Sequence, residues 1–314
     1  MPRELQTETG NLQFPAFLPV TTFGGKFPLD EILRPHLARF SVSVMVSHHY
    51  GQKMKTPACP ITFIDSGGFA SLFQSSTFEE RDGRFCIRTG EESLLDPLDV
   101  LAFQTKHAQI GATLDFIIPP DLAADQAKQR QEWTLRNAVW AIQNLESDLR
   151  VFGSIQAWDF DSAARLASQL APHPFSGFAL GGMVPRISKS QVIFDCVAGI
   201  RSIDSKRPLH VFGIGTPRLI KSLFEHGVDS VDSSSYVRSA VSGRYLDPES
   251  GNYVSISEVE SPRDRCGCRV CQTFDREYLQ LEGELNTMAL ALHNLIATMR
   301  FLNLVPCQSA PTSA

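Results

Sequence analysis

Residues 63–69 read Phe-Ile-Asp-Ser-Gly-Gly-Phe, an apolar run that ends in a carboxylate followed by a hydroxyl and two glycines. Residues 227–236, Gly-Val-Asp-Ser-Val-Asp-Ser-Ser-Ser-Tyr, repeat the pattern of an apolar run that ends in an acid. We expect each run to be a buried strand that delivers its acid, Asp65 or Asp232, to a loop at the mouth of a sheet. Two such carboxylates suit glycosidic chemistry, in which one attacks the sugar carbon and the other moves protons.

Similar short runs recur along the chain and alternate with helical patterns. The expected strands are 17–22, 42–47, 62–65, 114–118, 151–156, 178–181, 209–213 and 230–232, and the clearest helices are 122–145, 161–170, 189–200 and 217–226. This alternation predicts an α/β fold, an irregular (β/α)8 TIM-type barrel, with a doubly wound open sheet as the competing interpretation. The barrel is favoured because polar residues follow so many strands, at the rim where barrels build active sites: Ser47, Asp65, Asp121, Gln156, Gly181 with Gly182, and Asp232.

Two stretches depart from this alternation. Residues 69–97 have little periodicity and are expected to form a long insertion after the third strand. Residues 239–270 contain turn signals that indicate turns or a small hairpin. An amphipathic helix is expected after Cys271, with an apolar stripe of Leu279, Leu281, Leu285, Met288, Leu292, Leu295 and Met299. We therefore expect one barrel domain over residues 1–314 with a zinc-binding subdomain at about 239–302.

Composition limits the classes of partner. The chain has 314 residues, 43% of them hydrophobic, and a formal net charge of −5. Since nucleic-acid coating proteins are usually basic, any contact with a polynucleotide must use a local patch. No run is long and apolar enough for a transmembrane helix, and the polar N-terminus lacks a signal-peptide core. Seven cysteines, three of them within six positions, fit metal binding in a reducing compartment, so we expect a cytoplasmic protein without membrane contact.

The cysteine cluster has the spacing of a zinc site. Cys266, Cys268 and Cys271 can converge on one ion, and His293 on the following helix can supply the fourth ligand. A Cys₃His set is tetrahedral and closed, which predicts structural rather than catalytic zinc. The competing interpretation is a turn with incidental cysteines and a surface histidine.

Single residues in these motifs also have ordinary interpretations. Asp65 could cap a turn, and Asp232, which three serines follow, could cap a helix. Asp115 and Asp121 flank Phe-Ile-Ile-Pro-Pro; one of them could be structural, and Asp121 lies where the expected strand leaves the barrel. Phe69 offers a flat face for stacking.

In combination, the motifs resemble the tRNA-guanine transglycosylase superfamily, over about residues 17–302. The landmarks occur in family order: 65–69, 114–115 with Asp121, 152–156, 179–185, 210–215, 229–233 and the Cys-x-Cys-x-x-Cys…His set. The resemblance implies an irregular (β/α)8 barrel with a zinc-bearing insertion near the C-terminus.

The resemblance also implies a role for each matched residue. Asp232 matches the nucleophile that expels guanine from a nucleotide, and Asp65 matches the general acid/base. The other matches contact the base: Asp121 and Gln156 at the purine edge, Gly181 and Gly182 through their backbone, and Phe69 and Phe212 by stacking. The incoming base would be a 7-deazaguanine, and the sugar would pass through a covalent ester.

The polymer substrate is less closely defined by the resemblance. Residues 181–186 and 232–238 look more like the archaeosine-type branch than the queuine-type bacterial enzymes, and Ala70 stands where the family has Gln. Archaeosine-type enzymes usually append RNA-binding domains, whereas this sequence ends soon after the zinc helix. We therefore expect DNA as the substrate, with tRNA as the close rival.

The oligomeric state, two competing functions and the nucleic-acid contacts are the remaining questions. The resemblance allows a homodimer or a partner subunit, and a non-catalytic accessory subunit is a competing hypothesis that retention of Asp65 and Asp232 disfavours. An unrelated zinc-stabilised barrel that binds small molecules is another. We expect the nucleic-acid contacts at Arg238 and at the zinc loop, through Arg263, Arg265 and Arg269, unless these arginines pair with nearby acids on a solvated surface.

Overall fold

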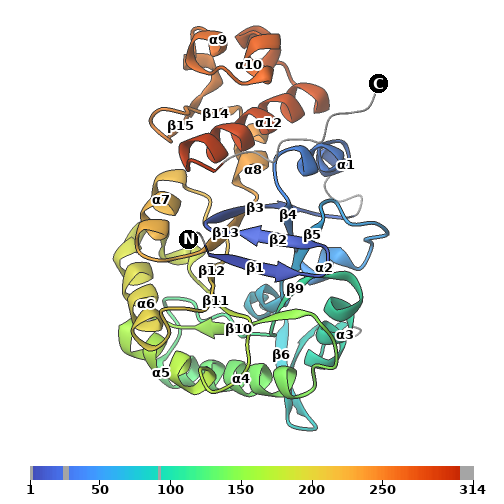
Figure 1. Cartoon of the computed structure of the whole chain (residues 1–314), viewed down its shortest axis with the longest axis vertical. Helices are drawn as coiled ribbons and strands as arrows, with labels where there is room; N and C mark the ends of the chain where they lie inside the picture. The colour runs from blue at the N-terminus through green and yellow to red at the C-terminus, as the bar shows by residue number, and fades with distance from the viewer. Residues whose placement is uncertain (1–2, 24–27, 91–92, 305–314) are drawn as a thin grey trace.

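The computed structural model describes residues 3–23, 28–90 and 93–304, and a closed barrel of eight parallel strands forms its centre (Figure 1). The strands, in chain order, are β3 (Ala16–Thr21), β4 (Ser43–Val46), β5 (Ile61–Ile64), β9 (Ile110–Ala112), β10 (Arg150–Gln156), β11 (Gly177–Gly181), β12 (Leu209–Val211) and β13 (Ser230–Ser233). Their order around the barrel follows the chain, and β13 pairs with β3 to close it. The predicted barrel is confirmed, and closure excludes the open sheet.

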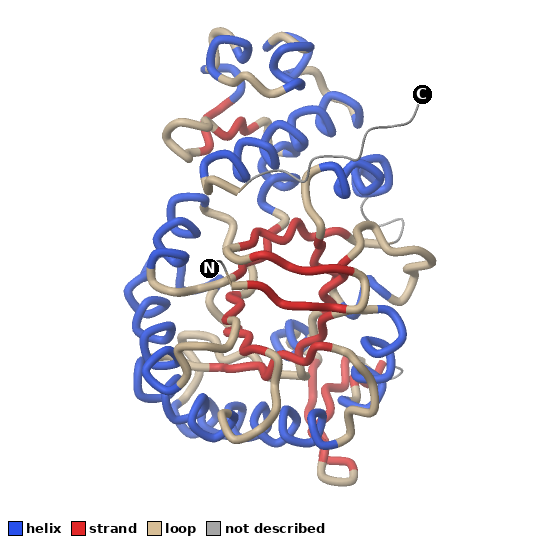
Figure 2. Tube along the Cα trace, in the orientation of Figure 1, coloured by secondary structure: helices blue, strands red, loops and turns tan. Residues whose placement is uncertain are grey.

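Helices surround the strands (Figure 2). They are α1 (Pro28–Leu33), α2 (His48–Gly51), α3 (Pro97–His107), α4 (Ala124–Gln143), α5 (Phe160–Leu170), α6 (Ser190–Ile203) and α7 (Pro217–Glu225). The last four correspond to the helices expected from the sequence. Local chemistry sets their starts: α5 begins with a capping box between Asp159 and Ser162, and α7 begins at Pro217, whose missing N–H is harmless in a first turn. No helix in the described ranges combines the length and apolarity needed to cross a bilayer.

The fourth barrel strand is Ile110–Ala112, so the expected strand at 114–118 is wrong. The apolar run is buried, but its amides do not join the ladder of strands. Phe116 N–H donates to Thr134 Oγ1 and Ile117 N–H to Ser71 Oγ, at 3.1 and 3.0 Å. Because side chains from distant segments satisfy this backbone, the run is extended without pairing.

The barrel interior is filled by apolar side chains and covered at its amino end by an N-terminal hairpin. Strands β1 (Glu4–Thr7) and β2 (Gly10–Gln13) pair antiparallel just before β3 begins. Leu5 and Leu12 of the hairpin belong to the same buried cluster as Leu18, Phe63 and Phe152 from the strands. With the amino end covered, the carboxyl end is where a ligand can enter.

The expected insertion at 69–97 is largely a small antiparallel sheet. It consists of β6 (Ser76–Arg81), β7 (Arg84–Thr89) and β8 (Ser93–Leu95). Arg81 pairs with Arg84 across the two-residue turn Asp82-Gly83, and both turn residues have positive φ. An Asp-Gly pair is the usual sequence signal for this kind of turn, so the hairpin was detectable from the sequence.

The segment expected to form the zinc-binding subdomain packs outside the barrel wall, on the side of β3 and β13 (Figure 1). It follows α8 (Ser235–Val241) and contains β14 (Arg244–Leu246), β15 (Tyr253–Ser255), α9 (Pro262–Arg265), α10 (Arg269–Thr273), α11 (Arg276–Gln280) and α12 (Glu284–Phe301). The pairing of β14 with β15 confirms the small hairpin. The predicted apolar stripe is wrong at Leu281 and Leu285, which are exposed because the expected helix is divided into α11 and α12. Leu281 directly follows α11, and Leu285 lies in the first turn of α12.

One buried amide holds this segment against the barrel. Asn294 on α12 accepts from Leu246 N–H at 2.8 Å and donates to the carbonyls of Tyr236 and Arg244, at 3.2 and 3.0 Å. Tyr236 in turn donates its hydroxyl to the carbonyl of Val20 in β3. The hydrogen bonds therefore run from α12 through α8 into the wall of the barrel.

Candidate functional site

Asp65 follows the last residue of β5, at the carboxyl rim of the barrel. Its Oδ1 accepts from the backbone N–H groups of His48 and Gly67, at 2.8 and 2.9 Å. Gly67 has φ +74°, a conformation in which a side chain would be strained. Burial raises the pKa of Asp65 to about 6 against the effect of the two backbone hydrogen bonds, and the nearby charges of Asp232 and Asp115 raise it further. A carboxyl with this pKa can give and take a proton near neutral pH.

Asp115 lies beside Asp65 and is almost fully buried. It accepts from Ser66 Oγ at 2.7 Å and from Gln156 Nε2 at 2.5 Å. Desolvation raises its pKa, while these two hydrogen bonds oppose the shift. A Cβ at Gly68 would lie 2.1 Å from its Oδ1, and one at Gly181 would lie 2.9 Å from its Oδ2. The glycines are therefore required for the acid to fit beneath the two loops.

Asp232 lies on β13, across the barrel mouth from β9. Its Oδ1 accepts from the Gly213 N–H at 2.9 Å and faces His210 Nε2 at 3.0 Å. His210 is completely buried, and its Nδ1 lies 2.9 Å from Ser230 Oγ. The two contacts fix Oδ1 of Asp232. Imidazole Nε2 is the donor in the contact with His210, because a carboxylate oxygen accepts. The second oxygen has no hydrogen-bond partner among the described residues, so it is available for attack.

A pocket of about 410 Å³ joins the three acids. Its walls also include Phe69, Phe212, Gly181, Gly182 and Arg238. The side chain of Phe69 is 65% exposed, which leaves its ring available for stacking. Gln156 is fully buried behind the wall, where it contacts Asp115. The structure thus brings Asp65 and Asp232, together with Asp115, the expected aromatic rings and the expected glycines, around one cavity of the size of a small ligand.

Asp121 is the predicted base-contacting residue that the structure does not bring to this pocket. Its side chain is exposed in the turn after Pro120, and it is not among the lining residues. The chain leaves the rim through Ile118, whose N–H donates to Gln156 Oε1, so Asp121 is carried outward. Asp115 lines the pocket in the place where Asp121 was expected. Its sequence signal is the one seen at Asp65, an acid directly after an apolar residue.

His210 is a further residue that the sequence analysis did not single out. Histidines on apolar strands are usually packing residues, and only the contact with Asp232 gives this one a role at the site.

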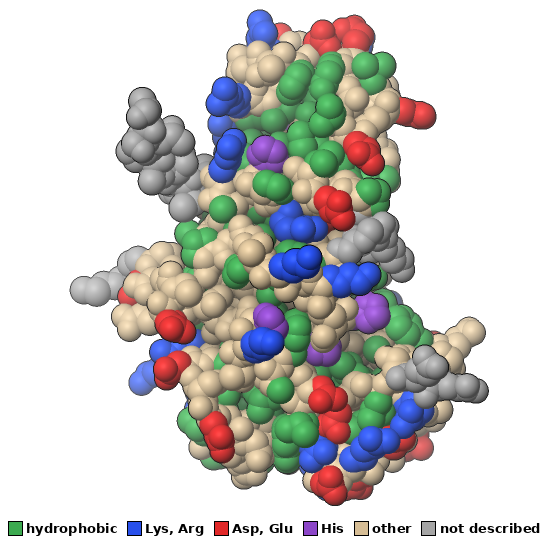
Figure 3. Space-filling model, turned by 90° about the vertical axis from the view of Figure 1, so that its right-hand side faces the viewer, with side chains coloured by type: hydrophobic (Ala, Val, Ile, Leu, Met, Phe, Trp, Pro, Cys, Tyr) green, Lys and Arg blue, Asp and Glu red, His purple; other side chains and the backbone are tan. Residues whose placement is uncertain are grey.

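The zinc-loop arginines lie apart from the pocket. Arg263 donates to the Gln272 carbonyl at 3.0 Å, and Arg265 lies 3.4 Å from Asp247. Arg269 is exposed, and none of the three is among the residues that line the pocket. On the face shown in Figure 3, both basic and acidic side chains are present, and neither sign covers the whole face. Any grip on a polynucleotide is therefore local.

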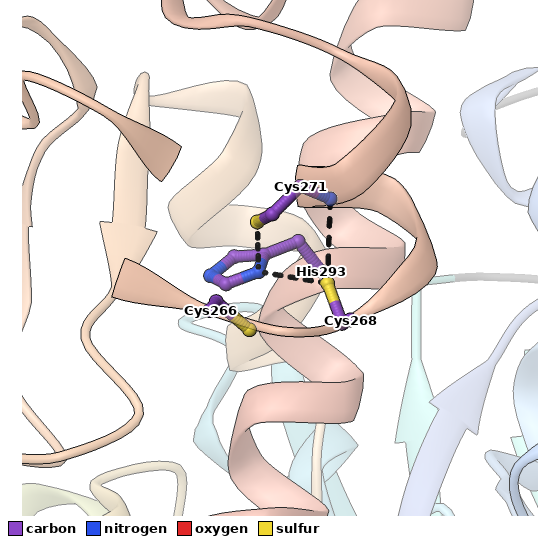
Figure 4. A group of neighbouring side chains, drawn as sticks. All are labelled: Cys266, Cys268, Cys271 and His293. Carbon is purple, nitrogen blue, oxygen red and sulfur yellow. Dashed lines mark hydrogen bonds between the residues drawn. The ribbon is translucent and has the colours of Figure 1, made fainter. Parts of the chain in front are cut away.

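The predicted metal ligands converge. One donor atom from each of Cys266, Cys268, Cys271 and His293 lies within 4.8 Å of the others, and all four residues are buried. Figure 4 shows the imidazole of His293 among the sulfur atoms, with Nδ1 3.1 Å from Cys271 Sγ and 3.5 Å from Cys268 Sγ.

The surroundings of the cluster favour metal binding. His293 Nε2 lies 2.9 Å from the Leu246 carbonyl, which holds the proton on Nε2 and leaves Nδ1 free to bind a metal. Hydrogen bonds within the cluster lower the pKa of Cys266 and raise the pKa of Cys271, so the thiols titrate as one coupled group. The four residues therefore fit a closed, structural metal site without an open position.

The comparisons with known proteins agree with this geometry. The family model described as queuine tRNA-ribosyltransferase matches residues 3–305. A tRNA-guanine(15) transglycosylase of Thermococcus onnurineus is 27% identical over 96% of this chain, and one of Pyrococcus furiosus is 26% identical over 96%. One of Methanopyrus kandleri is 29% identical over 65%.

The match covers only part of these relatives. The chain spans 51% of the length of the first two proteins and 45% of the third, or about half. The family model nevertheless covers nearly the whole of this chain, including the three acids and the Cys₃His cluster. An unrelated barrel is thereby excluded, and the chain belongs to the queuine tRNA-ribosyltransferase family, with similarity to the archaeal tRNA-guanine transglycosylases.

Proposed function

We propose that this chain is a pentosyltransferase that exchanges guanine in a polynucleotide for a 7-deazaguanine base. One observation carries the proposal: Asp65 and Asp232, from opposite sides of the barrel mouth, line the same 410 Å³ pocket. Each is fixed by backbone N–H groups from a neighbouring loop, so their separation is set by the fold. A nucleophile and a proton carrier on one pocket are what a double displacement at a sugar carbon requires.

The reaction would proceed in two halves. In the first, the free oxygen of Asp232 bonds to C1′ of the target nucleotide while the bond from C1′ to N9 breaks, and guanine leaves with a proton from Asp65. In the second, Asp65 takes the N9 proton of the incoming 7-deazaguanine, whose nitrogen displaces the Asp232 ester. Two inversions retain the configuration, and Asp65 returns to its starting state.

Asp115 would select the base. Its carboxylate, oriented by Ser66 and Gln156, is an acceptor for the N–H donors on the pyrimidine edge of guanine. Phe69 and Phe212 would stack on the two faces of the ring, each worth about 1–3 kcal/mol. Removal of the target nucleotide from its stack would bring C1′ to the acids, since the glycosidic carbon is hard to reach within a duplex.

Two polynucleotides, tRNA and DNA, are candidates for the substrate. The relatives from Thermococcus onnurineus and Pyrococcus furiosus are tRNA-guanine(15) transglycosylases, which supports tRNA for this chain. The preference for DNA in the sequence analysis stays a prediction. Incorporation of labelled guanine into a tRNA transcript and into duplex DNA, measured side by side with the same enzyme preparation, separates the two.

The first prediction concerns covalent trapping. Wild-type protein should form a denaturation-resistant adduct with its polynucleotide, and Asp232→Asn should form none, because the amide cannot bond to C1′. Exchange should fall by roughly 10⁴-fold or more, the scale for loss of a nucleophile. Asp121→Asn is the matched control and should retain both adduct and exchange. An adduct in Asp232→Asn would exclude this residue as the nucleophile.

The second prediction concerns pH. Since the pKa of Asp65 is raised to about 6, the protonated acid prevails below that pH and the carboxylate above it. Single-turnover release of guanine needs the acid, so its rate should fall as the pH rises through about 6. Asp65→Asn should slow release by at least about 10²-fold and remove this inflection. A variant that kept the wild-type profile would exclude the proton-transfer role.

The third prediction separates the two candidate base-contacting acids. Asp115→Asn should raise KM for free guanine by about 10- to 100-fold, the equivalent of losing one hydrogen bond to a charged group. Asp121→Asn should leave KM unchanged. The opposite result would return the base contact to Asp121.

The fourth prediction concerns the metal, which we propose to be structural zinc. Metal analysis should find one zinc per chain, and Cys271→Ser should lose it and unfold at lower temperature, because metal binding contributes directly to folding. Cys196→Ala, which changes a buried thiol on α6, should keep the metal. Freshly purified wild-type protein without zinc would refute the assignment.

A further inference from the structure

A second cleft opens on the same rim of the barrel as the pocket of Asp65, Asp115 and Asp232. Its volume is about 420 Å³. Its lining comes from the segments that follow β9, β10 and β11: Ile118, Pro119, Pro120, Leu122, Ala124, Ala127, Trp158, Pro185, Arg186, Ser188, Lys189 and Val192. Pro185 lines both cavities, so the cleft lies directly outside one wall of the pocket.

Arg186 is the unusual residue of this cleft. Only 5% of the residue is exposed. Its Nη1 donates to the carbonyls of Ile118 and Gly182, at 2.8 and 2.6 Å. Nε and Nη2 have no hydrogen-bond partner among the described residues, and they are not enclosed away from solvent. No carboxylate of the described ranges lies within ion-pair distance of this guanidinium. A guanidinium that is held through Nη1 and turns its two remaining nitrogens to a cleft without a counter-ion is suited to bind an anion there.

The other charges around the cleft agree in sign. Lys189, which is exposed, is the second ionisable residue in the lining, and the lining contains no Asp or Glu. Asp121, Asp125 and Asp159 adjoin lining residues in the sequence, but all three are exposed and none of them lines the cleft. Trp158 and the three prolines supply an apolar wall. In this surrounding a guanidinium binds a phosphate oxygen strongly.

Arg130 provides an internal comparison. It is also partly buried, and it donates to the carbonyl of Ile117, the residue before the one that Arg186 binds. Its guanidinium lies over the ring of Phe78, 5.1 Å from the centroid, and it does not line the cleft. A hydrogen bond to the backbone of residues 117–118 therefore does not by itself explain why Arg186 faces the cleft.

We propose that this cleft holds a backbone phosphate of the substrate strand, next to the nucleotide whose base enters the pocket. The inference rests on the proposed function for the identity of the strand. A polynucleotide that places one guanine in the barrel mouth must lay its neighbouring phosphates on the rim, and Arg186 with Lys189 is the cationic pair in the lining of the cleft. Since Arg186 also holds the Gly182 carbonyl, the same side chain connects the phosphate to the pocket wall.

The test measures affinity for a tRNA transcript and for duplex DNA as a function of salt, with Arg186→Met, Lys189→Gln and Arg130→Met. Loss of one phosphate contact should lower the slope of log K against log salt by about 0.7–0.9. Arg186→Met and Lys189→Gln should each show this change on the polymer that binds, together with roughly tenfold weaker binding at low salt. Arg130→Met should match the wild type.

Several outcomes decide against the proposal. Unchanged slopes in both cleft variants overturn it, and if Arg186→Met does not fold, Lys189→Gln decides alone. Inorganic phosphate is the second probe: if it raises the Tm of the wild type and not of Arg186→Met while the polymer slopes stay unchanged, the cleft takes a free anion and the strand assignment fails. Base exchange measured on the same samples separates the two hypotheses. Exchange with unchanged slopes refutes the cleft alone, whereas altered slopes without exchange refute the proposed function alone.

Discussion

The junction between β5 and β9 is the constraint on which the site depends. The ladder there has only two residue pairs, Phe63 with Ile110 and Ile64 with Gly111. The buried side chain of Gln104 on α3 reinforces this junction by donating to the carbonyls of Ile64, Asp65 and Ala112. A Cβ at Gly111 would lie 2.6 Å from Gln104 Oε1, so glycine is required for the helix to come this close. Because the junction carries Asp65 and leads directly into Asp115, its geometry places two of the three acids.

The three acids then differ through their surroundings rather than their residue type. Asp65 is desolvated and accepts only backbone hydrogen bonds, and its pKa rises to about 6. Asp115 is enclosed by side-chain donors, which suits recognition of a base edge. Asp232 is held at one oxygen by His210 and Gly213, so the other can attack. One parallel barrel thus gives three carboxyl groups different surroundings within one pocket, which supports the proposed roles of proton carrier, recognition group and nucleophile, because strands from different sides deliver them to a common rim.

The metal cluster and the Arg186 cleft lie next to different strands of the barrel. On the side of β13, α10 with the turn before it and α12 carry the Cys₃His cluster, and Asn294 connects this segment to the barrel. On the side of β9 to β11, the loops enclose the cleft of Arg186. A polynucleotide that crosses the barrel mouth from one side to the other would pass over the pocket. The same polynucleotide could therefore make the proposed contacts at the zinc loop and at the cleft.

The sequence by itself determined the features that depend on neighbours along the chain. Apolar runs that end in polar residues predicted seven of the barrel strands near their observed positions, and the spacing of Cys266, Cys268 and Cys271 predicted the cluster with His293. Tertiary structure alone decided that β9 is Ile110–Ala112 and that Asp115, not Asp121, lines the pocket. The reason is that the amides after β9 bond to side chains of Ser71, Thr134 and Gln156, which are distant in sequence. The cleft was equally invisible, since its cations acquire a role only when three loops from neighbouring strands enclose them.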